Sequence, residues 1–460
     1  MGKQGTKFVN YSQYFFVCVV GIQFLLLLFT CFTAWPEMIL WPYLILKGWL
    51  PYRDIAIAHT PLLLLDLTIF YKLFGLGVTQ LKIFTWLYIL ATDLVFYWVV
   101  KKLLSGVKAL VSLVMFVFLS LGFQINGLWF DLGLVLPAIL IFYFLKTKKY
   151  FWVGVIWTVA FFTKQTAVLF LQAIGVWFFV SQRKNFKSFW PEAEKIILTF
   201  LISALAVFLP LAALKILPSF LTWAFQFGVY YLPRAVGQIS LPTLKQLLGV
   251  ASQFLIVFPY LWLFKKKSDL TLLSFVLFLC LGAYPRWELF HFLPALPFLA
   301  IVAAEVLVRG AQIKSNLVKL MVGVWLAICL TFLARYVSRN LTTEVRFFEP
   351  SVQKLAGDIK KEVGTKEIFI INYWDSLYAF SGTLPAVKPW IPYMPWYLEY
   401  GNLKKEVVNQ VKIARPAAIV VGKFTTQGPG AYKLPDLMEY VNRYYQLEET
   451  VGSAQLYLKK

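Results

Sequence analysis

Long apolar segments follow one another from residue 12 to residue 336, and short clusters of lysine and arginine separate them. Hydrophobic residues make up 60% of the 460 residues and charged residues only 14%, and the mean hydropathy is +0.70. So few polar side chains cannot cover a surface that faces water. The chain is therefore predicted to be a membrane protein that crosses the bilayer many times.

The charge and the cysteines exclude several other classes. The formal net charge is +22, but most basic residues outside the C-terminal part fall in short clusters between apolar segments. Cytoplasmic loops of membrane proteins have this distribution, so no nucleic-acid partner is expected. The cysteines lie in or beside apolar segments, which indicates neither a disulfide framework nor a zinc cluster. They are Cys18, Cys31, Cys280 and Cys329.

The basic residues also predict the orientation. Lys3 and Lys7 place the N-terminus inside, and the uninterrupted apolar segment of about 12–34 is predicted to be a signal anchor. An external loop over 35–79 follows. Its apolar segment 62–74 is too short for the roughly 20 residues that a crossing needs, so we predict an interfacial or re-entrant helix there.

With this orientation the basic clusters lie in the cytoplasm, and about eleven crossings are predicted. Residues 151–182 are predicted to form two short helices that meet at an external apex, because one helix would bury Lys164 at mid-bilayer at a cost of about 2.5–3.5 kcal/mol. The aromatic external segment 217–245 is predicted to form a pair of helices at the lipid headgroups. The other crossings are predicted near 80–100, 106–123, 128–145, 197–216, 246–264, 269–284, 292–308 and 318–336.

The composition changes at about residue 337. Segments with helical periodicity alternate with short apolar segments typical of buried strands, which predicts a small extracytoplasmic α/β domain over 337–460, after a membrane domain over 1–336. No phosphate-binding glycine motif opens its helices, so nucleotide binding is not expected. The predicted strands are 367–372, 417–422 and 454–458, and the predicted helices are 346–364, 402–414 and 434–446.

The predicted topology brings polar residues from separate external segments to one face of the membrane. Carboxylates beside several cations suit a general base together with an anionic, phosphate-bearing ligand. We therefore predict a single extracytoplasmic cleft at the lipid boundary. The residues are Glu37, Arg53, Asp54 and His59 in the first loop, then Asn126, Asp131, Lys164, Gln165, Arg234, Arg286, Glu288 and His291.

Several of these residues also have a purely structural interpretation. Asp131 can stabilise a helix N-terminus, and Lys164 can extend its ammonium group to the interface. Arg286 and Glu288 can pair at the headgroups, and His291 can serve as a polar anchor. Glu37 and Asp54 are harder to explain in this way, although Arg53 can neutralise Asp54 in a structural pair.

An ordered set of motifs resembles the GT-C glycosyltransferases, and within them the bacterial relatives of the protein O-mannosyltransferases and the lipid A aminoarabinose transferase. The set begins with an acid just past the first helix, Glu37, and the Gly-x-x-Pro-Tyr-Arg-Asp stretch from Gly48 to Asp54. It continues with His59-Thr60-Pro61-Leu62, Lys164-Gln165-Thr166-Ala167 and the stretch from Arg286 to Pro297. Two departures are Pro36-Glu37 in place of an Asp-Glu pair and Thr60-Pro61 in place of Pro-Pro.

The resemblance implies a GT-C fold and an inverting transfer of a sugar from a polyprenyl-phosphate donor to a glycan, lipid or protein acceptor outside the cytoplasmic membrane. It implies that Glu37, or else Asp54, is the catalytic base. His59, Lys164 and Arg286 match positions near the carrier phosphate. Arg53, Asp131, Gln165, Arg234 and His291 are the further candidates for donor binding. No metal is required, although a divalent ion at Asp54, Glu37 and Asp131 is possible.

Two other functions remain open. A transporter or flippase of a lipid-linked or anionic substrate would have internal repeats and helices broken near mid-membrane. The sequence has no evident repeat, and its polar residues gather at one face. A non-catalytic assembly protein is the third interpretation, which only an activity measurement can separate from the first.

Overall fold

The computed structural model describes residues 3–182, 189–264, 269–310, 312 and 315–460. The chain forms two compact units that each combine distant segments. A helical unit comprises Met1–Phe32, Thr85–Val207 and Leu241–Thr343, and a mixed unit comprises Thr33–Phe84, Phe208–Ser240 and Glu344–Lys460. The linear division predicted at 336/337 stays a prediction.

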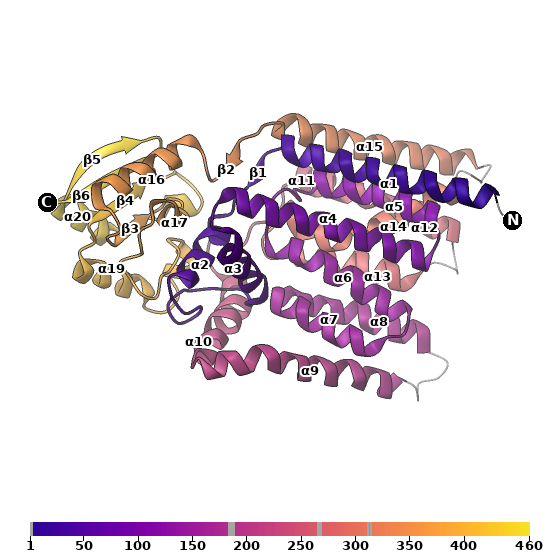
Figure 1. Ribbon diagram of the computed structural model, residues 1–460, viewed down its shortest axis with the longest axis horizontal. Helices are drawn as coiled ribbons and strands as arrows, with labels where there is room; N and C mark the ends of the chain where they lie inside the picture. Colours follow the sequence, from indigo (N-terminus) through magenta and orange to yellow (C-terminus); the bar gives the residue numbers. More distant parts are fainter. Residues whose placement is uncertain (1–2, 183–188, 265–268, 311, 313–314) are drawn as a thin grey trace. The chain divides into compact units, whose positions relative to one another are not determined.

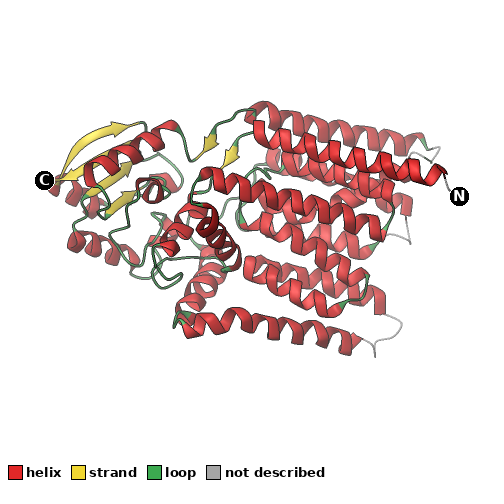
Figure 2. Ribbon diagram, viewed as in Figure 1, coloured by secondary structure: helices red, strands yellow, loops and turns green. Residues whose placement is uncertain are grey.

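Within the described residues, five helical stretches are long and apolar enough to cross a membrane. Together with the shorter apolar helices, they confirm the prediction of a helical multi-pass membrane protein, whereas the number of crossings stays a prediction. The five stretches are α4 (Val78–Leu103), α9 (Phe189–Ala213), α11 to α12 (Leu244–Phe264), η8 with α14 (Leu289–Gly310) and α15 (Asn316–Asn340). Figures 1 and 2 show the helices of the helical unit side by side.

The remaining helices of this unit correspond to predicted crossings. They are α1 (Lys3–Phe29), α5 (Gly106–Gly122), α6 (Phe130–Lys146), α7 (Tyr150–Thr163), η1 (Gln165–Leu169), α8 (Phe170–Gln182), α13 (Leu270–Cys280) and η7 (Leu281–Ala283). The 21-residue stretch 244–264 is divided into α11 (Leu244–Gln253), η5 (Phe254–Ile256) and α12 (Val257–Phe264).

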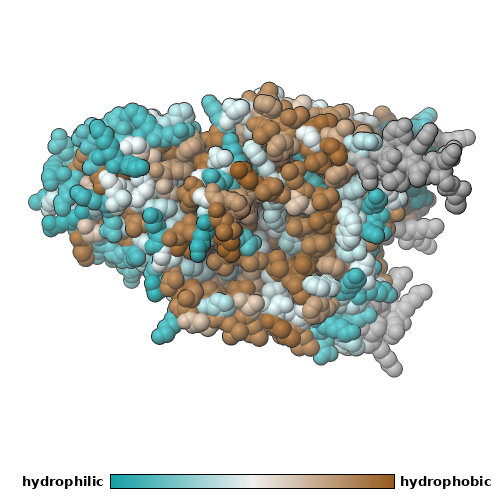
Figure 3. Space-filling model, in the orientation of Figure 1, coloured by the Kyte–Doolittle hydropathy of each residue, from teal (hydrophilic) through white to brown (hydrophobic). Residues whose placement is uncertain are grey.

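Burial distinguishes a central helix from peripheral ones. Helix α14 (Leu296–Gly310) is buried along most of its length and packs against α5, and its Ala300, Ala303 and Ala304 let neighbouring backbones approach closely. Helix α9 instead exposes Ile202 and Leu209, which suit contact with lipid tails. Hydrophobic side chains cover much of the visible surface of the helical unit, and the C-terminal segment is hydrophilic (Figure 3).

The break predicted at Lys164 is present. Helix α7 ends at Thr163, Lys164 has extended backbone angles, and η1 starts at Gln165. Two helices therefore replace one long helix, as predicted, and Lys164 itself is buried at the break.

In the mixed unit, α2 (Pro36–Leu46) and α3 (Leu62–Phe74) pack against each other. The bounds of α3 agree with the predicted interfacial helix 62–74. Tyr71 Oη donates to the Met38 carbonyl at 3.2 Å, and Tyr43 Oη donates to the Thr383 carbonyl at 2.9 Å. The first loop is thus bonded to the C-terminal segment.

The segment 217–234 is one continuous helical stretch rather than the predicted pair. It consists of α10 (Leu217–Phe220), the π-helical η3 (Leu221–Tyr231) and η4 (Leu232–Arg234). A side chain at Gly228 would put its Cβ 2.3 Å from the Ala58 carbonyl oxygen, so glycine lets this helix approach the first loop closely. This close approach joins segments distant in sequence, so no local sequence pattern predicts it.

The C-terminal segment contains a four-stranded sheet of order β3-β4-β6-β5. Strands β3 (Ile368–Ile371) and β4 (Ala418–Gly422) are parallel, and β6 (Ala454–Lys459) is antiparallel to both β4 and β5 (Tyr445–Val451). Three of these strands match the predicted ones, and β5 was missed because YQLEETV is too polar to suggest a buried strand. The short strands β1 (Phe32–Thr33) and β2 (Val345–Arg346) were not predicted either.

Helices cover this sheet, and three of them match predicted helices. These are α16 (Pro350–Val363), α19 (Leu403–Ala414) and α20 (Pro435–Tyr444), while α17 (Leu377–Ser381), α18 (Pro395–Leu398) and η9 (Pro429–Ala431) are additional short elements. Side chains from β3, β4, α19 and α20 form a continuous apolar core that includes Ile371, Ile419, Val411 and Leu437.

Candidate active site

The helical unit buries a cluster of three ionisable side chains, Asp131, Lys164 and His291. Lys164 Nζ donates to Asp131 Oδ1 at 2.7 Å and to Oδ2 at 2.6 Å. His291 Nδ1 lies 2.8 Å from Asp131 Oδ2. The exposed fractions are 1% for Asp131, 5% for Lys164 and 8% for His291. Three elements distant in sequence thus supply one cluster that is nearly free of solvent contact.

Local structure explains how each side chain reaches the cluster. Asp131 lies in the first turn of α6, where the helix dipole favours a negative charge. Lys164 lies at the break between α7 and η1, and His291 lies in η8 (Leu289–Ala295), which leads into α14. Breaks and helix starts are the places where a polar side chain can leave an otherwise apolar helix.

The hydrogen-bond pattern assigns roles within the cluster. A carboxylate only accepts hydrogen bonds, so His291 Nδ1 carries the hydrogen of its contact with Asp131. Two of the three ammonium hydrogens of Lys164 are directed at Asp131. Within the described residues no hydrogen bond engages His291 Nε2. One ammonium hydrogen and His291 Nε2 therefore remain for a ligand, and Asp131 orients both groups as a carboxylate orients a catalytic histidine.

The other candidates in this unit lie close in sequence to the cluster. Gln165 directly follows Lys164 and is half-buried. Arg286 Nε lies 3.6 Å from Glu288 Oε1, and both side chains are partly exposed, which agrees with the structural interpretation of this pair. Asn126 is buried, and its Nδ2 donates to the carbonyls of Leu27 and Thr30, so it joins α1 to the turn before α6.

In the mixed unit, Glu37 lies in the first turn of α2 and is half-buried. Its charge acts on two residues of the C-terminal segment, Asp375 and Tyr397. Burial raises the pKa of Asp375 well above its usual range, and the neighbouring charge of Glu37 raises it further. Burial and the same charge also raise the pKa of Tyr397. Glu37 and Asp375 are therefore neighbouring carboxyl groups, and the ionisation of Asp375 is disfavoured.

Sequence reasoning missed Asp375. It follows β3, whose neighbour β4 is parallel, and the carboxyl ends of parallel strands are common positions for functional side chains. The position of Asp375 shortly after the predicted strand 367–372 is the sequence feature that could have identified it as a candidate.

Asp54 is held in a different environment from Glu37. Arg53 Nε donates to Oδ1 at 2.9 Å, Arg53 Nη2 donates to Oδ2 at 3.0 Å, and the Leu50 N–H donates to Oδ2 at 2.9 Å. Burial alone would raise the pKa of Asp54, but these hydrogen bonds and the charges of Arg53 and Lys388 outweigh it and hold the pKa below its usual value. Such a carboxylate is a weak base and suits a structural role.

The first loop is fixed by further contacts around Asp54. Tyr52 is buried with φ +67°, and its Oη donates to the His59 carbonyl at 2.9 Å. The Trp390 N–H donates to the Asp54 carbonyl at 2.8 Å. His59 itself is half-buried. Arg234 is exposed, with its guanidinium 4.5 Å from the centre of the Tyr230 ring.

The structure thus distributes the predicted residues over two units. Asp131, Lys164 and His291 meet in the helical unit, with Gln165 next to them. Glu37 is joined by Asp375 in the mixed unit, where Arg53 and Asp54 form a separate pair. No group of three or more potential metal-binding His, Cys, Asp or Glu side chains occurs among the described residues. The prediction that all candidates share one cleft stays a prediction, as do their individual roles.

Comparison with known proteins extends the description of the fold. The sequence matches no family model and no curated protein. The structure is similar to ArnT from Cupriavidus metallidurans in the apo state, with a TM-score of 0.66 at 12% identity over 98% of both chains. For ArnT bound to undecaprenyl phosphate, the TM-score is 0.63 at 12% identity, over 97% of this chain and 98% of that one.

A second protein shares the architecture. The archaeal oligosaccharyltransferase AglB from Archaeoglobus fulgidus, in complex with an inhibitory peptide and a dolichol-phosphate, superimposes with a TM-score of 0.56 at 11% identity. The match covers 90% of this chain and 70% of AglB. At such identities the likeness establishes the fold.

Proposed function

Because the chain has the fold of the GT-C glycosyltransferases, we propose that it transfers a sugar from a polyprenyl-phosphate donor to an acceptor hydroxyl on the extracytoplasmic face of the cytoplasmic membrane. The structures of ArnT with undecaprenyl phosphate and of AglB with a dolichol-phosphate support a donor of this class. The observation that carries the proposal is the buried Asp131–Lys164–His291 cluster.

The cluster suits the departing phosphate of the donor. When the bond between the anomeric carbon and the phosphate oxygen breaks, negative charge grows on the phosphate. A fixed ammonium group in a site with little water stabilises that charge strongly. Asp131 holds Lys164 in place before the donor binds, so no reorganisation is needed during the reaction. The remaining Lys164 hydrogen would be donated to a phosphate oxygen, and His291 Nε2 would accept a hydrogen bond from a sugar hydroxyl of the donor.

Glu37 suits the other half of the reaction. A carboxylate takes the proton of the acceptor hydroxyl while the oxygen attacks the anomeric carbon, and a single displacement inverts that carbon. Burial and the neighbouring charge of Glu37 disfavour ionisation of Asp375, so the two carboxyl groups together favour a single negative charge. The low pKa of Asp54 favours Glu37 over Asp54 as the base.

The proposal is tested with purified protein in nanodiscs and undecaprenyl-phosphate sugars. Release of undecaprenyl phosphate and transfer to a lipid, glycan or peptide acceptor are measured separately. We expect Lys164→Met to lower kcat/KM by about 10²- to 10³-fold, the loss typical of removing one preorganised donor to a developing charge. Turnover that is unchanged in Lys164→Met would contradict the proposal.

A second lysine–carboxylate pair in the same unit provides the control. Lys108 Nζ donates to both carboxylate oxygens of Glu305, at 2.8 and 2.9 Å, as Lys164 does to Asp131. Lys108→Met should leave kcat/KM within about twofold, because an ion pair away from the chemistry does not stabilise the transition state. Movement of the donor lipid across the bilayer without release of its phosphate would instead identify a flippase.

A further inference from the structure

A second site lies on the C-terminal α/β segment, apart from the residues of the proposed reaction. It is a cavity with a volume of about 680 Å³, bounded by α19, α20, β5 and β6. Charged side chains and tyrosines form its whole lining, without an aliphatic residue. The lining residues are Lys412, Arg415, Asp436, Glu439, Tyr440, Arg443, Tyr444, Tyr445, Lys459 and Lys460.

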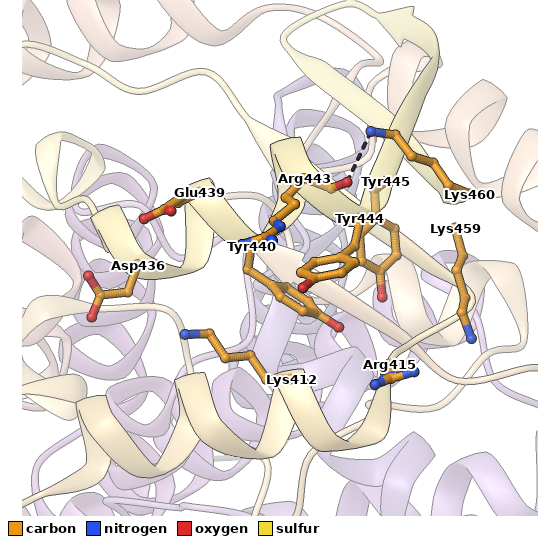
Figure 4. Close-up of a pocket in the computed structure, with 10 residues that line it drawn as sticks. All are labelled: Lys412, Arg415, Asp436, Glu439, Tyr440, Arg443, Tyr444, Tyr445, Lys459 and Lys460. Atoms are coloured by element: carbon orange, nitrogen blue, oxygen red, sulfur yellow. Dashed lines mark hydrogen bonds between the residues drawn. The ribbon is translucent and has the colours of Figure 1, made fainter.

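Cations dominate the cavity. Five of its side chains are basic and two are acidic. Figure 4 shows the carboxylates of Asp436 and Glu439 at one end of the view and Arg415 and Lys459 at the other. Among the described residues, no ion pair joins a basic side chain of the cavity to either carboxylate. The cavity therefore presents uncompensated positive charge, which attracts an anionic ligand.

The tyrosines are held in fixed positions between these cations. Tyr445 Oη donates to the Pro416 carbonyl at 2.8 Å, and the Tyr440 ring centre lies 5.0 Å from that of Tyr444. Tyr440 and Tyr445 are buried, whereas Tyr444 is 48% exposed, with the Arg443 guanidinium 5.5 Å from its ring centre. An aromatic face beside a basic group can pack against the apolar face of a ring that carries a negative charge.

The backbone supports a role for Arg415. This residue ends α19 with φ +47°, a left-handed conformation in which glycine is the usual residue. The chain instead has an arginine there, and its side chain lines the cavity. A position that favours glycine for conformational reasons thus supplies a cation.

From these features we infer that the cavity binds an anionic glycan, meaning sugar units that carry phosphate or carboxylate groups. The volume lies within the range of small-molecule sites and exceeds that of a single phosphate ion. The exposed face of Tyr444 suits a sugar ring, and the surrounding cations suit the negative charges of the glycan. A lipid surface is less suited, because membrane association of this kind uses apolar side chains beside the cations. If the chain has the proposed function, this glycan is the acceptor of the sugar, and that part of the inference rests on the proposed function.

The test measures binding rather than transfer, with the full-length protein in nanodiscs of neutral lipid. The fluorescent probes are a phosphorylated dextran oligomer and an oligogalacturonate of equal length, with a neutral dextran oligomer for comparison. We expect saturable binding of at least one anionic oligomer, weakened by salt, and about tenfold weaker binding of dextran. Equal binding of the neutral oligomer would overturn the inference.

Two variants locate the binding. Lys412→Glu with Arg415→Glu should weaken binding of the anionic oligomer by about tenfold or more, whereas Lys360→Glu with Lys366→Glu, at exposed positions outside the cavity, should have little effect. Tyr444→Ala should weaken it several-fold without disturbing the core, because this side chain is half exposed. Equal effects of the two charge-reversal variants would overturn the inference.

The remaining outcomes separate this inference from its alternatives. Binding to vesicles with anionic lipid through Lys412 and Arg415, without binding of either oligomer, would identify a lipid-surface site and overturn the inference. If the protein binds an oligomer but has no transferase activity, the glycan site is supported and the proposed function is contradicted. Transferase activity without binding of either oligomer would overturn the inference about the cavity and leave the proposed function standing.

Discussion

Lys164 Nζ lies within 2.7 Å of both carboxylate oxygens of Asp131, and both side chains are buried in the helical unit. Buried opposite charges compensate each other's loss of hydration only as a pair. The pair therefore has consequences for stability that are separate from its proposed part in the reaction.

Removing one member of this pair should destabilise the protein more than removing both. We expect Asp131→Asn or Lys164→Met alone to lower the free energy of unfolding by about 3–5 kcal/mol, because an uncompensated charge stays buried. Asp131→Leu with Lys164→Met should recover much of that loss and yet remain inactive. Thermal unfolding in detergent, together with turnover, checks this. A double variant no more stable than the single ones would contradict it.

Glu37 and Asp54 should differ in their effect on turnover. We expect Glu37→Gln to lower kcat by about 10²- to 10⁴-fold, the usual contribution of a general base. Asp54→Asn should reduce activity far less, because its carboxylate is engaged by Arg53 and the Leu50 N–H. Steady-state kinetics on folded variants checks this, and a larger loss in Asp54→Asn would reverse the assignment of the base.

Asp375 should make stability fall as the pH rises. Its pKa in the folded protein is raised, so above its unfolded value of about 3.9 the folded state disfavours the ionisation that the unfolded state allows. Asp375→Asn removes this effect. The difference between the midpoint temperatures of unfolding, Asp375→Asn minus wild type, should therefore increase from pH 4 to pH 8.

Asp54→Asn provides the opposite control for that measurement. The pKa of Asp54 is lowered in the folded protein, so this group contributes stability that is present above its unfolded pKa and is lost as the pH falls through the folded value. Asp54→Asn should thus be less stable than the wild type at neutral pH and approach it in acid. Identical pH trends for the two variants would contradict both assignments.

Gly228 should not tolerate a side chain. A Cβ there would lie 2.3 Å from the Ala58 carbonyl oxygen, so Gly228→Ala must separate η3 from the first loop, and we expect a loss of about 1–3 kcal/mol. Gly249→Ala in α11 is the matched control, because no atom lies within 4 Å of its added Cβ. That variant should be stabilised by up to about 1 kcal/mol. Thermal unfolding of the two variants separates steric contact from helix propensity.

The predicted orientation can be tested with single cysteines in a chain without its natural ones. Val236, in the mixed unit, is 90% exposed, and Leu104, after α4, is 42% exposed. With the mixed unit outside, a membrane-impermeant maleimide should label Val236→Cys in intact cells and Leu104→Cys only after lysis. Asn126 is unsuitable as a probe because its side chain is buried and bonded to Leu27 and Thr30. The reverse labelling pattern would overturn the topology.

Hydropathy and charge placement in the sequence determined most of the secondary structure. The helix over 62–74, the break at Lys164 and three of the four strands of the C-terminal sheet were predictable because each depends on a local property. A helix must be long enough to cross a bilayer, a lysine avoids its centre, and buried strands are apolar. Strand β5 lacks that apolar signal, and the close approach of Gly228 to Ala58 joins segments distant in sequence.

Only the tertiary structure decided which polar residues meet. Asp131 is 33 residues from Lys164 and 160 residues from His291, and the bonds between them follow from how α6, η1 and η8 pack. The same applies to Glu37 and Asp375, which share no motif, and to Arg53, whose bidentate bond gives Asp54 a structural environment. Local sequence records the preference of each residue for helix, strand or interface, whereas the pKa of a carboxyl group depends on burial and on charges that folding brings near it.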